Sequence, residues 1–559
     1  MKRLLLYART LAHLRPTQIL ALFRMRLLPS SRQAPHIHEL RLRPGVGLST
    51  CLSHSRLLGR DRSFCFLNQE KTIPDSGIDW ASKDMPKLWR YNLHYFDYLF
   101  DADRSQDAKV HLISDWIAKN PPGIGDAWEP YTLSLRIVNW IKFFREEGVT
   151  LREGWLQSLY QQALWLESTV EYHILANHYL KNGVALFFAG LYFEGDDAER
   201  WLKMGLKILR EELEEQFLAD GGHFERSPMY HSICVVDYLD VLNLIQNSQA
   251  AINVEETAKF RRTVTASLNF LHDICLPDSE IPLFNDSASG IAPTPSRIFN
   301  YAVRVMGYES PVTPTGLSIH EKPQSGYYVC RNGGDVIIID CGSIGPDYQP
   351  GHAHCDTLSY ELAINGRRVI VDSGVFDYEL SSERAYARST SAHNTVVVDG
   401  EEQSEIWGVF RVARRAKPLR AFCQKQVDGS VTFEGAHNGY ERLAGKPIHK
   451  RHMSYDGKGS WVIKDMLEGR GTHRMESYIH IHPDFHVVQS EVGIRIIEPN
   501  GSTVAIIETL GQSQIRVEQG WYFPEFGVKR ENHVIVFTCS GESPLGLNYR
   551  IRKVLSQDQ

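Results

Sequence analysis

Two histidines and an aspartate lie at alternate positions in "GHAHCDTLSYELAINGRRVIVDSG", residues 351–374. If this stretch begins a strand, His352, His354 and Asp356 share one face, because alternate residues of a strand point the same way. His-x-His is also a common spacing of zinc ligands. The stretch therefore predicts a polar site at the start of a strand.

Asp372 in "VIVDSG" and His393 in "SAHNTVVVDG" are the next candidate ligands along the chain. An ideal two-residue turn at Asn365-Gly366 would place Asp372 opposite Ser359 and away from the histidines. A bulge or a neighbouring strand would have to correct this offset. The spacing alone therefore leaves metal binding and a purely structural role both open.

Polar side chains also interrupt the apolar pattern of the first half of the chain. Asn92 and His94 lie in "WRYNLHYFDY", where tyrosine rings beside amide and imidazole groups suit stacking on sugars. Asn177 and His178 interrupt an apolar helix in "ANHYLKNGVAL", where a buried amide is costly unless it is paired. Each cluster is either a binding site or a hydrogen-bonded part of the core.

A third cluster, "GGHFERSPMYHSICVVDYLD" (residues 221–240), places Glu225 and Tyr230 at the start of a predicted helix. Tyrosine serves as a general acid or base when its surroundings tune its pKa. Most tyrosines are packing residues, so Tyr230 considered by itself does not indicate catalysis.

The spacing of apolar residues divides the chain into a helical part and a strand-forming part, which must position these side chains. Apolar residues recur at three- and four-residue intervals from about 105 to 310, which predicts antiparallel helices. After a proline-containing segment (308–326) the period becomes two, with Asn-Gly, Asp-Gly and Gly-Gly turns. We therefore predict a helical and irregular segment (1–100) packing on a helical domain (101–312), followed by an antiparallel β-sandwich (322–559).

Composition excludes several classes of protein. The 559 residues carry a formal charge of −6, which gives no general attraction to nucleic acid or anionic lipid. The nine cysteines are scattered without a CxxC pair, which favours a reducing compartment. Charged residues interrupt the N-terminal apolar run, no signal peptide is evident, and no apolar stretch is long enough to span a membrane. We expect a cytoplasmic protein without a membrane span.

The motifs, taken in order, resemble those of the heparinase II/III-like polysaccharide lyases. The match includes "LWRYNLHYFDYL", "WEPYTLSLRIVNW", "ANHYLKNGVAL", "ERSPMYH", "PLFNDS" and "GHAHCDTLSYEL…VIVDSG…SAHNTVVVDG". The resemblance implies an incomplete (α/α) toroid followed by an antiparallel β-sandwich, with the active site between them. It also implies β-elimination on an acidic, uronate-containing polysaccharide or oligosaccharide.

The resemblance assigns roles residue by residue. Tyr230 and His352 correspond to the acid/base pair, and Asn177, or the adjacent His178, to the group that meets the uronate carboxylate. His354, Asp372 and His393 correspond to ligands of a structural metal ion, expected to be zinc, and no organic cofactor is implied. The further candidate substrate contacts are Asn92, His94, Arg136, Glu225, Arg384 and Arg388, the last two as anion contacts unless they form surface salt bridges.

Two other functions remain open from the sequence. A glycoside hydrolase would need two carboxylates flanking the scissile bond. Its candidates Glu129, Glu225, Asp286 and Asp356 form no convincing pair in the sequence. The other alternative is a non-catalytic carbohydrate-binding protein of exopolysaccharide assembly. The family also makes the periplasm an alternative location and a homodimer an alternative assembly.

Overall fold

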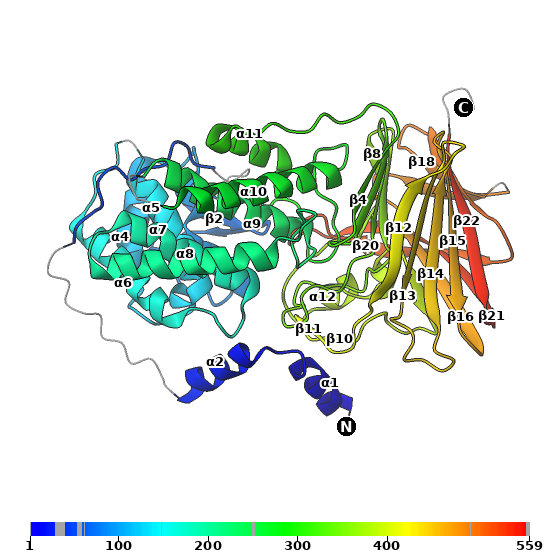
Figure 1. Ribbon diagram of the computed structural model, residues 1–559, viewed down its shortest axis with the longest axis horizontal. Coiled ribbons are helices and arrows are strands. Elements are labelled where there is room, and N and C mark those ends of the chain that lie inside the picture. Colours follow the sequence, from blue (N-terminus) through cyan, green and yellow to red (C-terminus); the bar gives the residue numbers. More distant parts are fainter. Residues whose placement is uncertain are drawn as a thin grey trace.

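The protein consists of a helical half and a sheet half that lie side by side (Figure 1). Helices α4 to α11 come first and the strands β4 to β22 follow, so the predicted class, a helical toroid followed by an antiparallel β-sandwich, is confirmed. The computed structural model describes residues 2–27, 40–52, 59–60, 62–146, 148–248, 252–491 and 493–554.

The helical half is built around α7, which packs against both α5 and α8. Glycines permit the close approach of α7 and α8. A Cβ atom at Gly190 would lie 2.4 Å from the backbone nitrogen of Leu202, and one at Gly205 would lie 2.5 Å from that of Phe187. The helices of this half are α3 (Lys87–Tyr95), α4 (Gln106–Lys119), α5 (Pro130–Phe144), α6 (Glu153–Thr169), α7 (Ala176–Tyr192), α8 (Asp196–Gln216), α9 (Pro228–Gln246), α10 (Val254–Ile274) and α11 (Pro295–Met306).

The sheet half contains three larger antiparallel sheets among the described residues. The five-stranded sheet has the order β4 (Ser318–Lys322), β5 (Tyr327–Asn332), β6 (Asp335–Asp340), β7 (Tyr360–Ile364), β8 (Arg367–Ile370). The eight-stranded sheet has the order β12 (Pro418–Lys425), β13 (Val431–His437), β14 (Ile448–Tyr455), β15 (Ser460–Glu468), β22 (Leu545–Lys553), β19 (Thr503–Thr509), β18 (Gly493–Ile497), β17 (His486–Ser490). The four-stranded sheet has the order β20 (Gln514–Tyr522), β21 (Arg530–Glu542), β16 (Thr472–His480), β9 (Val396–Val398).

The five-stranded sheet belongs to two cores. Val329 and Ile338 point into the core of the helical half, whereas Cys330 and Ile337 point into the core of the sandwich. Successive side chains of a strand face opposite sides, so both faces of β5 and β6 are covered. This double burial explains the continuous apolar run "VIII" in β6. A strand with one exposed face would instead alternate apolar and polar residues.

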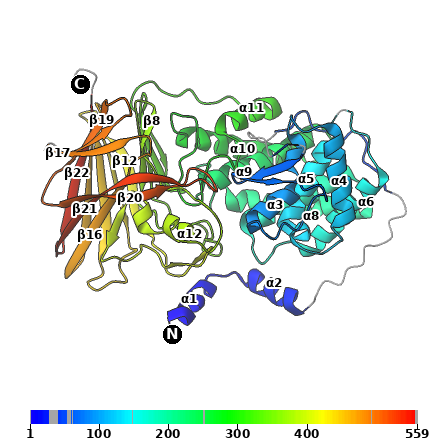
Figure 2. The ribbon, with the colours of Figure 1, turned by 180° about the vertical axis from the view of Figure 1, so that it is seen from behind.

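Helices α1 (Lys2–Leu11) and α2 (Pro16–Leu27) lie along one edge of the molecule, α1 beside the sheet half and α2 beside the helical half (Figures 1 and 2). Among the described residues, no helix combines the length and the apolar character needed to cross a bilayer.

Candidate active site

The histidine stretch is a loop between β6 and β7, and β7 begins only at Tyr360. The prediction that His352 begins a strand is therefore wrong. The Asn-Gly turn is present, with both residues at positive φ, and the β7–β8 pairing shifts register between Leu362 and Ala363. This one-residue shift does not itself bring Asp372 to the histidines, because β7 begins after them and β8 ends at Ile370.

The loop is polar because it pairs with residues 285–286 and not with a neighbouring strand. The Asp286 N–H donates to the His352 carbonyl oxygen at 2.9 Å. The His354 N–H donates to Asn285 Oδ1 at 3.1 Å, and the Asn285 N–H donates to Asp356 Oδ2 at 2.9 Å. The alternating polar side chains therefore join the loop of the sheet half to a loop of the helical half.

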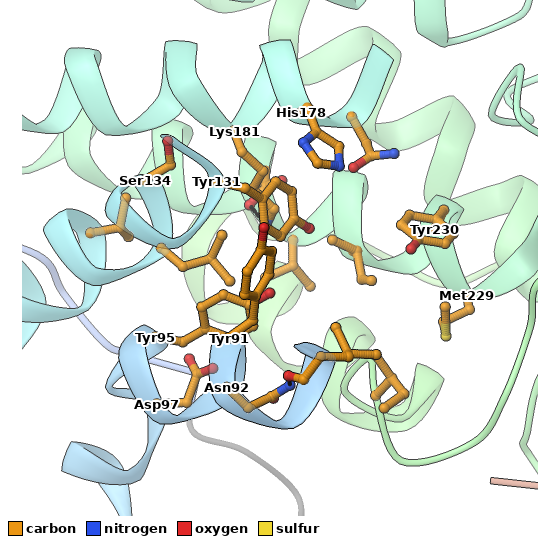
Figure 3. Close-up of a pocket in the computed structure, with 18 of the residues that line it drawn as sticks. Tyr91, Asn92, Tyr95, Asp97, Tyr131, Ser134, His178, Lys181, Met229 and Tyr230 are labelled. Atoms are coloured by element: carbon orange, nitrogen blue, oxygen red, sulfur yellow. Dashed lines mark hydrogen bonds and ion pairs between the residues drawn. The ribbon is translucent and has the colours of Figure 1, made fainter. Parts of the chain in front are cut away.

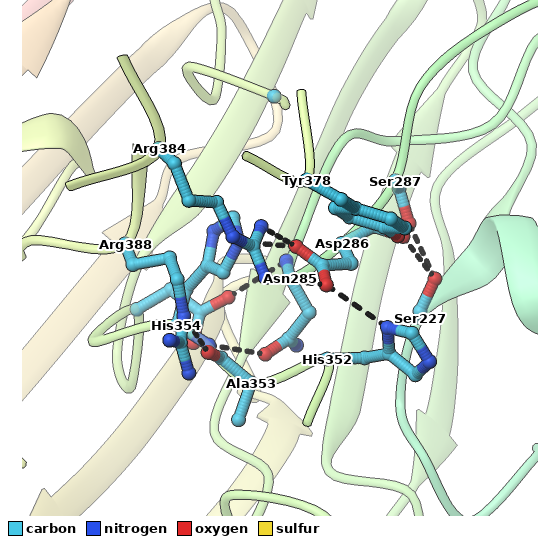
Figure 4. A network of polar contacts seen from close by, with 12 residues as sticks. Ser227, Asn285, Asp286, Ser287, His352, Ala353, His354, Tyr378, Arg384 and Arg388 are labelled. Atoms are coloured by element: carbon cyan, nitrogen blue, oxygen red, sulfur yellow. Dashed lines mark hydrogen bonds and ion pairs between the residues drawn. The ribbon is translucent and has the colours of Figure 1, made fainter. Parts of the chain in front are cut away.

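Asp286 is the centre of a buried network (Figure 4). Its Oδ2 lies 2.9 Å from His352 Nδ1, its Oδ1 lies 2.8 Å from His354 Nε2, and the Arg384 guanidinium donates to both oxygens. Burial alone would raise the pKa of Asp286, but the Arg384 charge and these hydrogen bonds hold it well below its usual range. The ionised carboxylate fixes the tautomer of His352, since it accepts the Nδ1 hydrogen.

The Nε2 edge of His352 faces Asn177, and a face of its ring lies against Tyr230. Its Nε2 lies 3.4 Å from Asn177 Nδ2 and 3.4 Å from a Glu225 carboxylate oxygen. The His352 and Tyr230 rings stack, with centroids 3.8 Å apart and planes inclined by 29°. The structure thus brings together three residues from distant parts of the chain, on helices α7 and α9 and on the sheet-half loop.

Tyr230 lies in the first turn of α9, which Ser227 caps by accepting the Tyr230 N–H at 3.2 Å. The Ser227 hydroxyl also donates to the Asp286 carbonyl oxygen at 2.7 Å, which ties this turn to the network. The Tyr230 hydroxyl is 3.3 Å from that of Tyr378. Burial, and secondarily the neighbouring Tyr378, raises the pKa of Tyr230 well above its ordinary value, so the side chain is a neutral phenol.

Asn177 lies at the start of α7, just after two residues at positive φ, Leu175 and Ala176. Such conformations are costly for residues with a side chain and occur where the surrounding structure enforces them. The Asn177 amide N–H and its side-chain Nδ2 both donate to Glu225 Oε1, at 3.2 and 3.1 Å. Asn177 Oδ1 is buried and has no hydrogen-bond partner among the described residues. The amide is therefore fixed in direction and not fully satisfied.

These residues border a cavity of about 540 Å³ between the two halves. Tyr91, Tyr95 and Tyr131 form an aromatic wall, with successive ring centroids 6.4 and 6.1 Å apart, and His178 lies 4.3 Å from the Tyr131 ring. Figure 3 shows the three tyrosines gathered in the middle of the cavity and Tyr230 to one side. Such a wall suits pyranose rings, which stack on aromatic faces while hydroxyls meet their polar rims.

Each lysine that lines the cavity is paired with a carboxylate. Nζ of Lys142 lies 2.5 Å from an oxygen of Asp240, and Nζ of Lys181 lies 2.6 Å from one of Asp237. Lys87, nearer the solvent, lies 3.0 Å from Glu129. The positive charge of the described cavity wall is therefore largely balanced within the protein.

Asn92 and His178, both predicted to touch substrate or its carboxylate, line the cavity. Asn92 Nδ2 is engaged by the Leu88 carbonyl oxygen at 2.8 Å, and His178 Nδ1 lies 3.0 Å from Glu171 Oε1. Burial would lower the pKa of His178, but the adjacent Glu171 raises it above the ordinary value. The predicted contact Glu225 does not line the cavity and instead supports Asn177.

His94 and Arg136 lie in the aromatic core, away from the cavity. His94 Nδ1 accepts from Trp116 Nε1 at 3.1 Å, and Arg136 lies over the Trp116 ring while donating to Gln162 and to the carbonyl of Ala127. Both side chains are almost fully buried. Substrate contact by these two residues does not fit the geometry, because their polar atoms are already used to satisfy the core.

Arg384 and Arg388 are buried and face the protein, so neither predicted alternative, a substrate anion contact or a surface salt bridge, describes them. Arg384 is held by Asp286 and by the Val409 carbonyl oxygen. Arg388 donates to the carbonyl oxygens of Ala353 and Gly408, which fixes the loop beside His352. Their role in this geometry is to position the histidine loop.

The three predicted metal ligands lie close together but do not form a complete site. His354 Nδ1 and His393 Nε2 are buried without a hydrogen-bond partner in the described part of the chain, and the two ring centroids are 5.3 Å apart. Asp372 Oδ2 is engaged by His393 Nδ1 at 2.7 Å. Among the residues described, no three His, Cys, Asp or Glu side chains are arranged to hold a metal ion. The two unsatisfied nitrogens fit a metal, whereas Asp372 would have to change partner.

Asp286 and Tyr378 are central to the site but were not predicted in these roles. Asp286 belongs to the matching motif "PLFNDS", yet the sequence suggested it only as a hydrolase carboxylate. No sequence signal marks Tyr378, which reaches Tyr230 from the loop after β8. Both roles depend on contacts between segments more than 60 residues apart.

Comparisons with known proteins agree with this architecture. The family models "Heparinase II/III N-terminus" and "Heparinase II/III-like, C-terminal" match residues 62–307 and 314–549. The chain belongs to the heparinase II/III-like family. It resembles a solved structure of Heparinase III with a TM-score of 0.67 and 20% identity, covering 86% of this chain and 80% of that one.

Two curated relatives are each named heparin-sulfate lyase. The protein from Pedobacter heparinus is 29% identical over 326 residues, which are 52% of this chain and 48% of the relative. The protein from Bacteroides thetaiotaomicron is 26% identical over 451 residues, which are 71% of this chain and 62% of the relative. The match thus spans about half to three fifths of these relatives.

Proposed function

We propose that the protein is a polysaccharide lyase that cleaves a uronate-containing glycan by β-elimination. The observation that carries this proposal is the stacking of Tyr230 on His352 at the cavity, with Asn177 3.4 Å from His352 Nε2. Lyases of this kind need an acid, a base and a group that neutralises the uronate carboxylate. The family membership and the relatives named heparin-sulfate lyase also support it.

The proposed chemistry follows from the hydrogen-bond geometry of His352 and from the raised pKa of Tyr230. His352 Nε2 is the base, because Asp286 accepts the hydrogen of the other nitrogen and leaves Nε2 facing the cavity. It removes the proton at C5 of the uronate, and the bond to the leaving oxygen at C4 breaks as the C4–C5 double bond forms. The neutral phenol of Tyr230 donates its proton to the departing oxygen. Asn177 Nδ2, which lies 3.4 Å from His352 Nε2, is the donor that stabilises the carboxylate as negative charge develops on it.

The hydrolase alternative is less well supported by the cavity. None of its candidates, Glu129, Glu225, Asp286 and Asp356, is among the residues found to line it. The carboxylates that do line it are engaged: Asp237 and Asp240 are paired with lysines, Asp97 accepts from Asn139 Nδ2 at 2.7 Å, and Glu379 accepts the Lys87 N–H at 3.2 Å. A carboxylate pair free to flank one glycosidic bond is therefore not found among the described residues.

Replacing Tyr230 tests the proposal. Tyr230→Phe should abolish the growth of ultraviolet absorbance from unsaturated uronate, because the departing oxygen loses its proton donor, while substrate binding persists. Tyr172→Phe, which changes a partly exposed tyrosine outside the cavity lining, is the matched control and should keep full activity. Full activity in Tyr230→Phe would remove this residue from the mechanism.

The substrate is to be identified with a panel of heparan, hyaluronan, alginate and bacterial exopolysaccharides, each scored for unsaturated products. The paired lysines of the cavity support a glycan that carries carboxylates with few sulfates. Binding of one glycan without any unsaturated product would favour the alternative of a non-catalytic exopolysaccharide protein. Products that have gained water and contain no double bond would favour the hydrolase.

We also propose a structural zinc ion held by His354, His393 and Asp372, supported by the two buried and unpartnered imidazole nitrogens. The metal would supply no step of the reaction and would brace the loop behind His352. Metal analysis of the purified protein and of His354→Ala tests this, and an equal metal content in the two would refute it.

A cytoplasmic location is supported by the nine unpaired cysteines and can be tested by cell fractionation. Whether the protein forms a homodimer can be tested by light scattering.

A further inference from the structure

The N-terminal helical pair, α1 and α2, packs with its polar side inward. An ordinary surface helix turns its apolar stripe to the core and its charged side to water. Here Gln18 of α2 is buried, with Nε2 3.4 Å from the Ile174 carbonyl oxygen and 3.5 Å from that of Tyr348. In α1, Arg9 pairs with Glu405 at 2.8 Å.

The side chains left outward are mainly apolar. Leu4 is 73% exposed, Leu20 is 70% exposed and Phe23 is 60% exposed. The pair holds nine of the 22 large apolar side chains that are exposed among the described residues, although it is a small fraction of the chain. Exposed apolar side chains gathered in one place mark an interaction surface, whereas single ones are ordinary.

The charge of the pair differs from that of the rest of the molecule. The first 27 residues contain six lysines and arginines and no aspartate or glutamate, while the whole chain has a formal charge of −6. Arg3 and Arg24 are exposed beside the outward leucines. Basic side chains that flank an exposed apolar stripe on one helix are characteristic of helices that lie in a lipid interface.

We propose that the N-terminal helical pair docks the protein on an anionic membrane surface. The outward leucines and Phe23 would enter the boundary between headgroups and acyl chains, and Arg3 and Arg24 would meet lipid phosphates. The absence of acidic residues from this segment favours an anionic lipid surface over two such pairs packed on each other, which would bring like charges together. The polar anchors on Glu405 and on the carbonyl oxygens of Ile174 and Tyr348 hold the pair across both halves.

Docking would also fix the position of the cavity relative to the lipid. The anchor carbonyls of Ile174 and Tyr348 lie a few residues before Asn177 and His352 along the chain. The proposal does not depend on the lyase reaction, because it concerns binding alone.

Flotation of the full-length protein with vesicles tests the proposal. Vesicles of phosphatidylglycerol mixed with phosphatidylcholine should carry the protein upward, vesicles of phosphatidylcholine alone should carry much less, and raised salt should weaken binding through charge screening. No flotation with the anionic vesicles would overturn the proposal.

The variant Leu20→Asp with Phe23→Asp should reduce the floated fraction about tenfold, because it places charge in the proposed lipid boundary. The fully exposed Val427, on the sheet half, provides the matched control Val427→Asp, which should float as the unchanged protein does. Circular dichroism and thermal unfolding would verify that both variants are folded. Undiminished flotation of the double variant would contradict membrane docking. So would a protein that is dimeric in solution when unchanged and as Val427→Asp but monomeric as the double variant, because the exposed apolar side chains would then form a dimer interface.

Discussion

Two buried networks in this protein have nearly the same composition and different surroundings. In the first, Asp286 binds His352, His354 and Arg384 beside the cavity. In the second, inside the sandwich, Asp465 binds His449 at 2.9 Å and Arg451 at 2.7 and 2.9 Å. Each is an ionised aspartate held between imidazole and guanidinium groups.

The difference lies in the outer edge of one imidazole. His352 keeps a side chain that is 12% exposed and turns Nε2 toward Asn177, whereas both His449 nitrogens are used internally, one by Asp465 and one by His437. The His449 side chain is fully buried. An Asp–His–Arg network is therefore a structural device by default, and it can serve catalysis only where a ring nitrogen reaches a cavity.

The largest expected effect separates the two histidines by activity. His352→Asn should lower kcat by about 10²- to 10⁴-fold, because the base at the cavity is lost. His449→Asn should leave kcat per folded molecule unchanged. Initial rates of unsaturated product, normalised to folded protein, measure both. Equal losses in the two variants would show that His352 acts only through the fold.

The next effect is on stability and concerns the network inside the sandwich. Asp465→Asn should lower the free energy of unfolding by about 3–5 kcal/mol, since it leaves the Arg451 charge buried without its partner. Denaturant unfolding measures this change. Lys450→Gln, on β14 beside Arg451 and with an exposed side chain, is the control and should change stability by less than about 1 kcal/mol. A similarly small effect of Asp465→Asn would mean that the sandwich network contributes little.

The smallest effect is the dependence of this stability difference on pH in the acid range. Burial alone would raise the pKa of Asp465, but Arg451 and the His449 hydrogen bond hold it well below its usual value. A carboxyl group with a depressed pKa contributes stability above its unfolded pKa of about 3.9 and loses this contribution as the pH falls toward the folded pKa. The stability gap between the wild type and Asp465→Asn should therefore narrow below about pH 4. A gap that stays constant during acid titration would contradict the assigned direction.

The fold was predictable because its signals are local. Helical periodicity, two-residue alternation and the Asn365-Gly366 turn each follow from neighbouring residues, and the structure confirms them. The histidine stretch is a loop in spite of its alternation, because its partners are Asn285 and Asp286 and not a strand.

The site was predictable only in part, and chiefly through the family resemblance. Tyr230, His352 and Asn177 converge as expected, but the sequence cannot distinguish a polar group that lines a cavity from one that satisfies an aromatic core. His94 and Asn92 lie two residues apart on α3, yet only Asn92 borders the cavity. Asp286 and Tyr378 required long-range contacts that no local pattern indicates.

The five-stranded sheet has a consequence for how the molecule comes apart. Its strands follow the helical half in the chain, but Val329 and Ile338 complete the helical core while Cys330 and Ile337 complete the sandwich. Melting either half would strip one face of this sheet, so calorimetry should record a single cooperative transition. For the same reason, cutting the gene between the two regions should yield fragments that aggregate.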